Sequence, residues 1–128
     1  MLKKPLVAGV ALVALALPVT AQAYAWHTVA TKSASGAFTI KSFSRTVNAP
    51  HGLRLKAGNS KGRAIVDWTL SCSKGFNIKA NGGTWHPGVG TTYQTLPMGM
   101  TNPGSCLVVL AISPSINGGT VTVALQRR

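Results

Sequence analysis

The segment CLVVLAISPSINGGTVTVALQ, residues 106–126, decides the fold class of this chain because it holds two strand patterns with a turn signal between them. In residues 120–126, two valines and a leucine alternate with two threonines and a glutamine. This period of two is typical of a β-strand with one buried face and one wet face. Asn117-Gly118-Gly119 has the composition of a tight turn. The segment therefore predicts antiparallel β-structure.

Residues 106–113 differ from the strand that follows because apolar side chains occupy both faces. Such a run predicts a central strand that is covered on both sides. A surface that meets a partner through Leu107 and Val109 is the alternative interpretation.

The rest of the chain shows short alternating segments, with Gly, Pro, Asn and Thr at intervals of about ten residues and no helical period. We expect six to eight strands in an antiparallel β-sandwich, immunoglobulin-like or Greek-key, with a small β-barrel as the alternative. The expected inward-facing pairs are Phe38 with Ile40, Leu53 with Leu55, and Phe76 with Ile78, and Asn81-Gly82-Gly83 is expected to form a turn.

Residues 1–23 have the pattern of a secretory signal peptide: a basic start, an apolar run and the small-residue end Ala21-Gln22-Ala23. The apolar run is too short for a comfortable membrane span of about 20 residues. We expect cleavage after Ala23 or Ala25, a single domain over residues 24–128, no membrane span in the mature chain, and a secreted or periplasmic location.

The chain has two cysteines, Cys72 and Cys106, and an exported chain passes through an oxidising compartment. A disulfide between them is the prediction. Trp68, four residues before Cys72, loosely resembles the tryptophan of immunoglobulin-like cores, although in those cores the tryptophan lies between the cysteines.

The formal net charge of the whole chain is +12, and from residue 24 onward eleven Lys and Arg face one Asp, a net charge of +10. Such an excess attracts polyanions. The segment RLKAGNSKGR predicts the principal anion-binding surface, and Arg127 with Arg128 form an auxiliary one. Its bases are Arg54, Lys56, Lys61 and Arg63. No nucleic-acid fold signature accompanies them, so sequence-specific nucleic-acid binding is not expected.

Asp67 is the only acidic residue in the chain. Within residues 65–72 it lies on the face opposite Trp68, which predicts an exposed carboxylate. We expect a cross-strand ion pair with one of the bases Lys41, Arg54, Lys56 or Lys79.

One carboxylate excludes the usual two-carboxylate glycosidase chemistry, carboxylate-rich calcium sites and two-metal sites. A hydrolytic triad would need Asp67 with His27, His51 or His86, and no GxSxG motif supports one. A non-enzymatic protein without a cofactor is therefore expected.

Residues 81–105 are rich in Gly, Pro and Thr and read as a long loop. Trp85 and Tyr93 in this segment could stack on sugar rings, or they could cap the end of the sandwich. His86, Met98 and Met100 form a soft ligand set suited to Cu(I), which loosely resembles the sites of small periplasmic copper carriers. The order and spacing of these residues depart from that pattern.

Together these features predict an exported binding module for polyanionic envelope or extracellular material, such as acidic polymers or acidic surfaces. A copper carrier and a self-associating, pilus-like structural subunit are the alternatives.

Overall fold

The computed structural model describes residues 25–128, which form eight β-strands and no helix. The predicted signal peptide, residues 1–23, and its cleavage after Ala23 lie outside the described residues. No helix long and apolar enough to cross a membrane occurs in the described part of the chain. The strands are β1 (His27–Ser35), β2 (Lys41–Asn48), β3 (Leu53–Asn59), β4 (Ile65–Lys74), β5 (Asn77–Trp85), β6 (Gly90–Leu96), β7 (Ser105–Ser113) and β8 (Thr120–Arg127).

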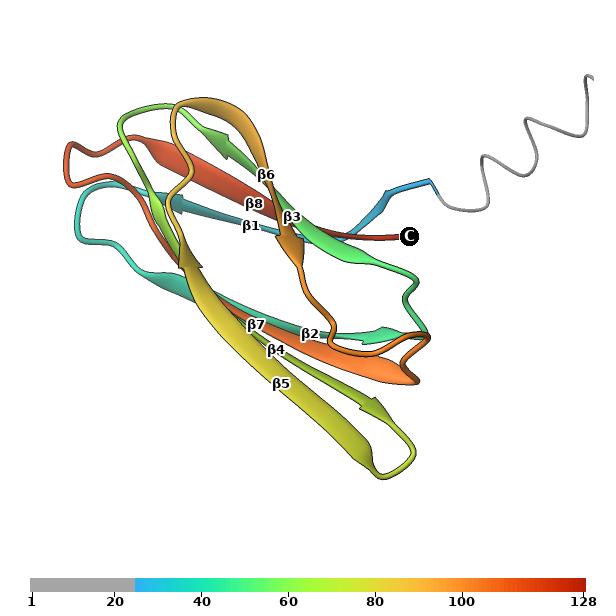
Figure 1. Cartoon of the computed structure of the whole chain (residues 1–128). Coiled ribbons are helices and arrows are strands. Elements are labelled where there is room, and N and C mark those ends of the chain that lie inside the picture. Colours follow the sequence, from blue (N-terminus) through green and yellow to red (C-terminus); the bar gives the residue numbers. More distant parts are fainter. Residues whose placement is uncertain (1–24) are drawn as a thin grey trace, which may run out of the picture.

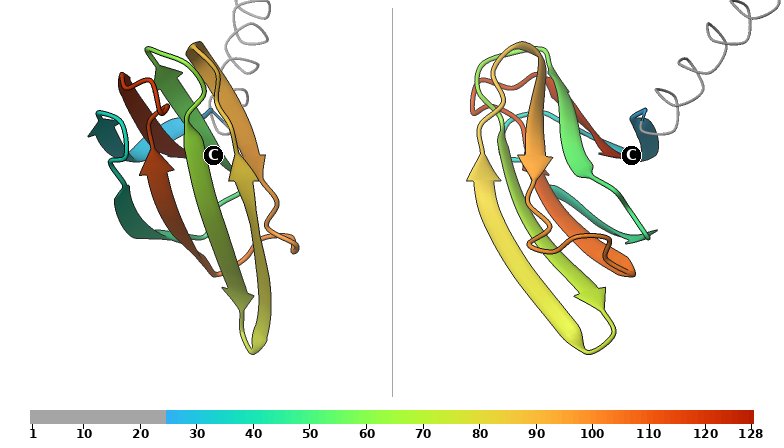
Figure 2. Two further views of the ribbon diagram at one scale, coloured as in Figure 1. Left: turned by 90° about the vertical axis from the view of Figure 1, so that its left-hand side faces the viewer. Right: turned by 45° about the vertical axis from the view of Figure 1, so that its right-hand side comes forward.

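The strands pair into two antiparallel four-stranded sheets that pack face to face (Figures 1 and 2). The first sheet has the order β1-β8-β3-β6, and the second sheet has the order β2-β7-β4-β5. Most consecutive strands alternate between the two sheets, and this order is that of a jelly roll, a sandwich built from two Greek keys. The predicted β-sandwich is confirmed, in its Greek-key form.

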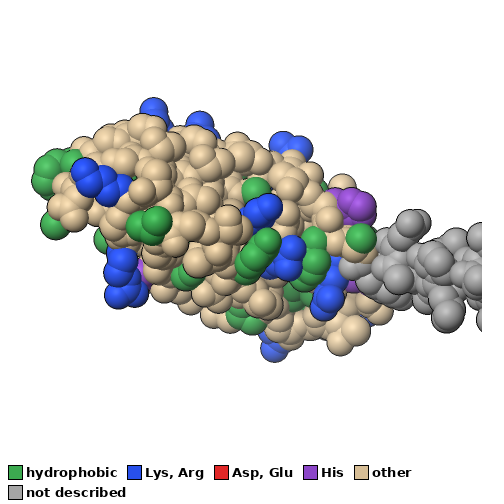
Figure 3. Space-filling view, turned by 90° about the horizontal axis from the view of Figure 1, so that it is seen from above, with side chains coloured by type: hydrophobic (Ala, Val, Ile, Leu, Met, Phe, Trp, Pro, Cys, Tyr) green, Lys and Arg blue, Asp and Glu red, His purple; other side chains and the backbone are tan. Residues whose placement is uncertain are grey.

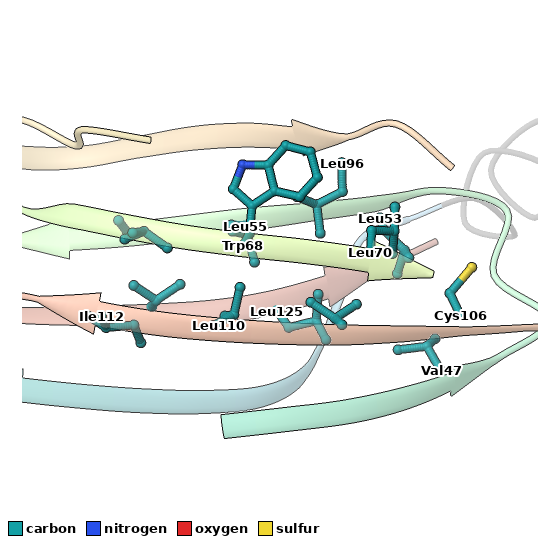
Figure 4. Packing of buried hydrophobic residues seen from close by; sticks show 14 of the residues in the cluster. Val47, Leu53, Leu55, Trp68, Leu70, Leu96, Cys106, Leu110, Ile112 and Leu125 are labelled. Atoms are coloured by element: carbon teal, nitrogen blue, oxygen red, sulfur yellow. The ribbon is translucent and has the colours of Figure 1, made fainter. Parts of the chain in front are cut away.

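Alternating side chains from both sheets fill the space between the layers (Figure 4). In β3 the buried apolar residues are Leu53, Leu55 and Ala57, and in β4 Trp68 is 7% exposed. The predicted alternation in β8 is also correct, since its valines and Leu125 are fully buried. Period-two patterning thus identifies the core wherever a strand is covered by the opposite sheet.

Cys72 and Cys106 form the predicted disulfide, with a Cα–Cα distance of 4.0 Å. They are directly opposite each other on β4 and β7, so the disulfide joins neighbouring strands of the second sheet. In an immunoglobulin core, by contrast, the disulfide links the two sheets to each other. The likeness suggested by Trp68 therefore does not extend to the position of the disulfide.

By register, the edge strand β1 places one base at a core-facing position and the edge strand β2 places two. Lys32 pairs with the buried Val123. Lys41 pairs with the buried Ile112, and Arg45 pairs with the buried Val108. An inward-pointing charge on an edge strand discourages another chain from adding to the sheet.

Two expected inward-facing pairs are wrong. Phe38 is 89% exposed and Ile40 is 69% exposed, because they lie in the turn between β1 and β2. Phe38 adopts a positive φ of 61°, which is incompatible with a strand. The first strand after this turn begins only at Lys41.

Phe76 is in the tight turn between β4 and β5 and is fully exposed, and Ile78 is 67% exposed. This hairpin extends beyond the opposite sheet, which cannot cover its residues (Figures 1 and 2). The turn expected at Asn81-Gly82-Gly83 is also wrong, because these residues continue β5. A Cβ on Gly83 would lie 3.0 Å from Cζ2 of Trp68, so this glycine makes room for the indole.

Residues 106–113 form most of β7, an interior strand of the second sheet, as predicted. Coverage on both faces is wrong, since Leu107 is 43% exposed and Val109 is 38% exposed. The long loop expected over residues 81–105 is likewise interrupted, because it contains the end of β5 and all of β6. Its glycines and threonines lie mainly in edge strands.

Candidate anion-binding face

The outer face of the first sheet is a grid of side chains set by strand register. Arg54 and Lys56 project outward from β3, between buried Leu53, Leu55 and Ala57. Lys56 pairs with Tyr93 on β6 and with Ala124 on β8, and Arg54 pairs with Gln126 on β8. Residues that alternate with the core thus share one outward surface.

A cationic–aromatic cluster lies on this face and consists of Trp26, Arg54, Tyr93 and Arg128. The Arg54 guanidinium carbon lies 4.4 Å from the ring centroid of Trp26 and 4.3 Å from that of Tyr93. The Arg128 guanidinium carbon lies 4.8 Å from the Trp26 ring. These distances are within the range of cation–π attraction, so both arginines are held against aromatic rings.

Hydrogen bonds fix Arg54 further. Its Nε donates to Oε1 of Gln126 at 2.7 Å, and Nε2 of Gln126 is 3.2 Å from Oγ1 of Thr28. Among residues 25–128, the terminal Nη groups of Arg54 and the Nζ group of Lys56 have no hydrogen-bond partner. The cluster therefore presents ordered donors for an anion without having to break an internal bond.

Arg128 reaches the cluster because the chain end is held at the β2–β3 loop. The backbone of Gly52 exchanges hydrogen bonds with that of Arg128, at 3.1 Å in each direction. A Cβ on Gly52 would lie 2.8 Å from Nε of Arg128 and 3.3 Å from Cη2 of Trp26. Glycine at this position lets both side chains pack against the backbone.

A shallow groove of about 280 Å³ adjoins the cluster on the same face. Small residues of the central strands, Gly58 and Ala124, form its floor, and Lys56 stands on its wall. Hydroxyl groups line the rest of the groove, from Thr28, Thr31 and Thr122. The groove thus places hydrogen-bonding groups next to a row of bases. Figure 3 looks onto this side, where hydrophobic and basic side chains alternate in a short row.

The structure divides the predicted ligand-binding residues. Arg54, Lys56 and Tyr93 come together on the outer face of the first sheet. Lys61 and Arg63 are exposed in the β3–β4 loop at one end of the sandwich, and Trp85 ends β5 in the second sheet, where it packs against the core. The predicted basic segment is therefore half strand and half loop.

Of the auxiliary pair, only Arg128 joins the cluster. The guanidinium of Arg127 donates to the carbonyl oxygens of Asn48 at 2.7 Å and Ala49 at 3.0 Å. Arg127 therefore holds the β2–β3 loop.

The residues of the alternative copper site are not brought together. His86 lies in the β5–β6 loop, whereas Met98 and Met100 follow β6 and pack against the core. The seven residues of β6 separate these two positions, a span of roughly 20 Å in an extended strand. In the described region, no three His, Cys, Asp or Glu side chains converge as a metal site.

Asp67 is exposed on the outer face of the second sheet, as predicted. The expected ion pair is wrong, because the residues opposite Asp67 are Thr84 and Ala111. Its Oδ1 accepts a hydrogen bond of 2.7 Å from Oγ1 of Thr84. The bases Arg54 and Lys56 lie in the other sheet.

Sequence reasoning missed Trp26 and Gln126 as parts of this face. Trp26 precedes the first strand and lies more than 25 positions from its ring partner Arg54, so local patterning carries no signal for it. A weak signal exists for Gln126, a polar residue on the outward side of a strand whose inward residues are apolar.

No family model matches this chain, and no curated protein matches its sequence. Among solved structures, it is similar to the carbohydrate-binding module TmCBM61 in complex with β-1,4-galactotriose (14% identity, TM-score 0.39, covering 80% of this chain and 88% of that one). It is also similar to the Yersinia pseudotuberculosis-derived mitogen (12% identity, TM-score 0.37, covering 80% and 85%).

A third similar structure is the enzymatically active domain of bacteriophage CBA120 tailspike protein 4 (11% identity, TM-score 0.43, covering 81% of this chain). The Gx strain of infectious bursal disease virus also matches (13% identity, TM-score 0.38, covering 80% of this chain). The present chain spans 19% of the tailspike chain and 30% of the viral chain. Similarities this low do not extend to function.

Proposed function

We propose that this protein is an exported, non-enzymatic module that binds acidic polymers of the cell envelope or the extracellular space on the outer face of the first sheet. The observation that carries the proposal is Arg54, held between the rings of Trp26 and Tyr93 while its terminal nitrogens stay unbonded within the described chain. A fixed guanidinium suits bidentate binding of carboxylate, sulfate or phosphate groups.

The neighbourhood of Arg54 supports a polymer as the ligand. Lys56 follows it along β3, Arg128 stands on Trp26, and the threonine-lined groove continues the same surface. Several bases in a row match a chain with repeated charges, and hydroxyl groups can bond sugar oxygens between those charges. Export is supported by the Cys72–Cys106 disulfide, which persists in oxidising compartments.

Heparin and polygalacturonate serve as acidic probes and dextran as the neutral control, with affinity measured at several salt concentrations. The test variant is Arg54→Gln with Lys56→Gln, and the matched control is Lys61→Gln with Arg63→Gln, which removes the same charge from the β3–β4 loop. We expect the test variant to lose about tenfold or more in affinity and to lower the salt slope by about two, one for each phosphate-like contact removed.

The control pair should lose less than about threefold, as expected for a general charge effect over a Debye length. Equal losses in the two variants would show that net charge alone drives binding and that the outer face is not a site. Binding to dextran as tight as to heparin would contradict an acidic ligand.

Self-association through the outer face of β7 is the second candidate function, because Leu107 and Val109 are partly exposed there. Sedimentation of the protein with and without Leu107→Ser and Val109→Ser tests it. A concentration-dependent dimer that these substitutions dissociate would favour the structural-subunit function.

A further inference from the structure

Four loops meet at the end of the sandwich opposite the start of β1 and the C-terminal residue: residues 36–40, 60–64, 86–89 and 114–119 (Figure 1). We call this surface the loop end. Backbone hydrogen bonds join neighbouring loops, from Gly36 N to Gly119 O at 2.9 Å and from Ala64 N to Pro87 O at 3.1 Å. Ser60 N donates to the carbonyl oxygen of Thr120 at 3.0 Å, which joins the loop of residues 60–64 to the start of β8, directly after the loop of residues 114–119. The four loops therefore form one continuous surface.

Large apolar side chains stand exposed on three of these loops. Phe38 is 89% exposed, Ile40 69%, Val89 66% and Ile116 77%. In Figure 3 hydrophobic side chains project from the left-hand end of the molecule, with Lys and Arg beside them. Single exposed apolar residues are ordinary, but four on one joined surface mark an interaction site.

The backbone of Phe38 reinforces this interpretation. Phe38 has a φ of 61°, in the left-handed region that bulky residues rarely adopt. The ring of Phe38 is exposed to solvent in the loop between β1 and β2. A strained backbone that exposes an aromatic ring is typical of a functional loop.

Bases accompany the apolar side chains. Lys41, Lys61 and Arg63 are exposed in or beside the same loops. The single acidic residue, Asp67, lies on the outer face of β4 and is bonded to Thr84. The loop end is therefore apolar at its tips and positively charged around them.

We propose that the loop end docks onto an anionic lipid bilayer, with Phe38, Ile40, Val89 and Ile116 entering the interface and the bases on the lipid headgroups. Apolar tips with surrounding bases are the pattern of interfacial membrane binding. The four apolar residues stand on three loops, and a fluid bilayer adapts to such tips, whereas a protein partner would need several matched pockets. This proposal is independent of the acidic-polymer site on the first sheet.

The experiment is co-sedimentation of residues 25–128 with vesicles of phosphatidylglycerol and phosphatidylcholine, at low and high salt. The test variant is Phe38→Ser with Ile116→Ser. The matched control is Phe76→Ser with Ile78→Ser on the β4–β5 hairpin, which carries equally exposed apolar residues beside Lys74 and Lys79. Unfolding of both variants is measured in parallel, and no loss of fold is expected since all four side chains are exposed.

We expect the test variant to weaken vesicle partitioning by about tenfold or more, because two apolar side chains leave the interface. It should lower the salt-resistant fraction of binding, since apolar insertion is not screened and only Ile40 and Val89 remain to insert. The control should weaken partitioning less than about twofold. Heparin binding should be unchanged in both variants, so that a failure here is distinct from a failure of the polymer site.

Three outcomes would overturn the proposal. Equal losses in the test and control variants would mean that any exposed apolar residue contributes. Vesicle binding that survives in the test variant and disappears in Arg54→Gln with Lys56→Gln would assign lipid attraction to the first sheet. A dimer that the test variant dissociates, without vesicle binding, would make a second copy of the chain the occupant.

Discussion

Arg54 and Lys56 lie in the middle of the outer face of the first sheet, with Tyr93 beside them on the edge strand β6. The middle of the outer face of the second sheet instead carries Thr69 and Val109. Both faces are made by the same alternation along strands that bury their other side in one core. By register, the outward positions of the second sheet include no Lys or Arg, only serines, threonines, Asn48, small or apolar residues and Asp67.

This difference concerns Arg54 and Lys56, two of the eleven Lys and Arg found from residue 24 onward. A charge excess that served solubility alone would be spread over both outer faces. Instead the strand-borne outward bases are concentrated on the first sheet, where two aromatic rings order one of them. The comparison therefore separates an outer face that carries an arginine held between two aromatic rings from one that carries no outward base.

The largest difference in stability between the two sheets is expected when one aromatic residue of each sheet is replaced by alanine. Trp68→Ala should lower the free energy of unfolding by about 3–5 kcal/mol, because it leaves a cavity in the core of the second sheet. Tyr93→Ala, an aromatic of the first sheet that is 51% exposed, should cost less than about 1 kcal/mol. Urea unfolding measures both, and similar costs would show that Tyr93 is structural.

The disulfide gives the second contrast, since it lies only in the second sheet. Cys72→Ala with Cys106→Ala should destabilise the protein by about 3–4 kcal/mol, from the entropy of the loop that the bond closes. Binding of heparin per folded molecule should not change, because the first sheet has no part in the bond. Lost affinity in fully folded variant protein would contradict the independence of the two faces.

Gly83 and Gly88 differ in the space that is available for an added methyl group. Gly83→Ala should cost about 1–3 kcal/mol, since the added methyl group would press on the Trp68 indole. Gly88→Ala is the control, because nothing lies within 4 Å of its added Cβ. Equal thermal stabilities of the two variants would mean that the indole moves aside without cost.

Tyr93→Leu tests the ordering of Arg54 without a large change of volume. Loss of one cation–π contact at an exposed site, worth about 0.5–1 kcal/mol, should weaken heparin binding by about two- to fivefold. Thr95→Val, a neighbouring outward position on the same strand, is the control and should leave affinity within about twofold. A loss in both variants would point to the strand itself.

The smallest effect is expected at Asp67, the one charge on the outer face of the second sheet. Asp67→Asn should change the free energy of unfolding by less than about 1 kcal/mol, because an exposed amide oxygen can still accept the bond from Thr84. Chemical denaturation measures the change. A decrease of several kcal/mol in the free energy of unfolding would show that this exposed carboxylate stabilises the fold.

Sequence patterning predicted the class of fold, the disulfide and the buried faces of β3, β4 and β8, because these strands are covered by the opposite sheet. It failed at Phe38, Phe76 and Ile78, which alternate correctly but lie in or beside turns where no sheet covers them. Alternation reports which residues share a side, and only the tertiary arrangement decides whether that side is covered.

The candidate site shows the same limit. Arg54 and Lys56 were recognisable as a basic pair, and their exposure followed from the alternation with Leu53 and Leu55. The contacts of Arg54 with Trp26 and Tyr93 were not recognisable from the sequence. Tyr93 reaches Arg54 only through the pairing of β3 with β6, and Trp26 reaches it only through the packing of the segment before β1. Contacts between distant segments depend on topology, which one sequence does not specify.

The position of β8 has a consequence for how the chain folds. This last strand lies in the interior of the first sheet, between β1 and β3, and pairs His27 with Arg127. The first sheet therefore cannot close until β8 has been synthesised and has left the ribosome. Pairings of such large sequence separation slow folding to milliseconds or seconds, so the first sheet and its candidate anion-binding face form late, after the other seven strands have been made.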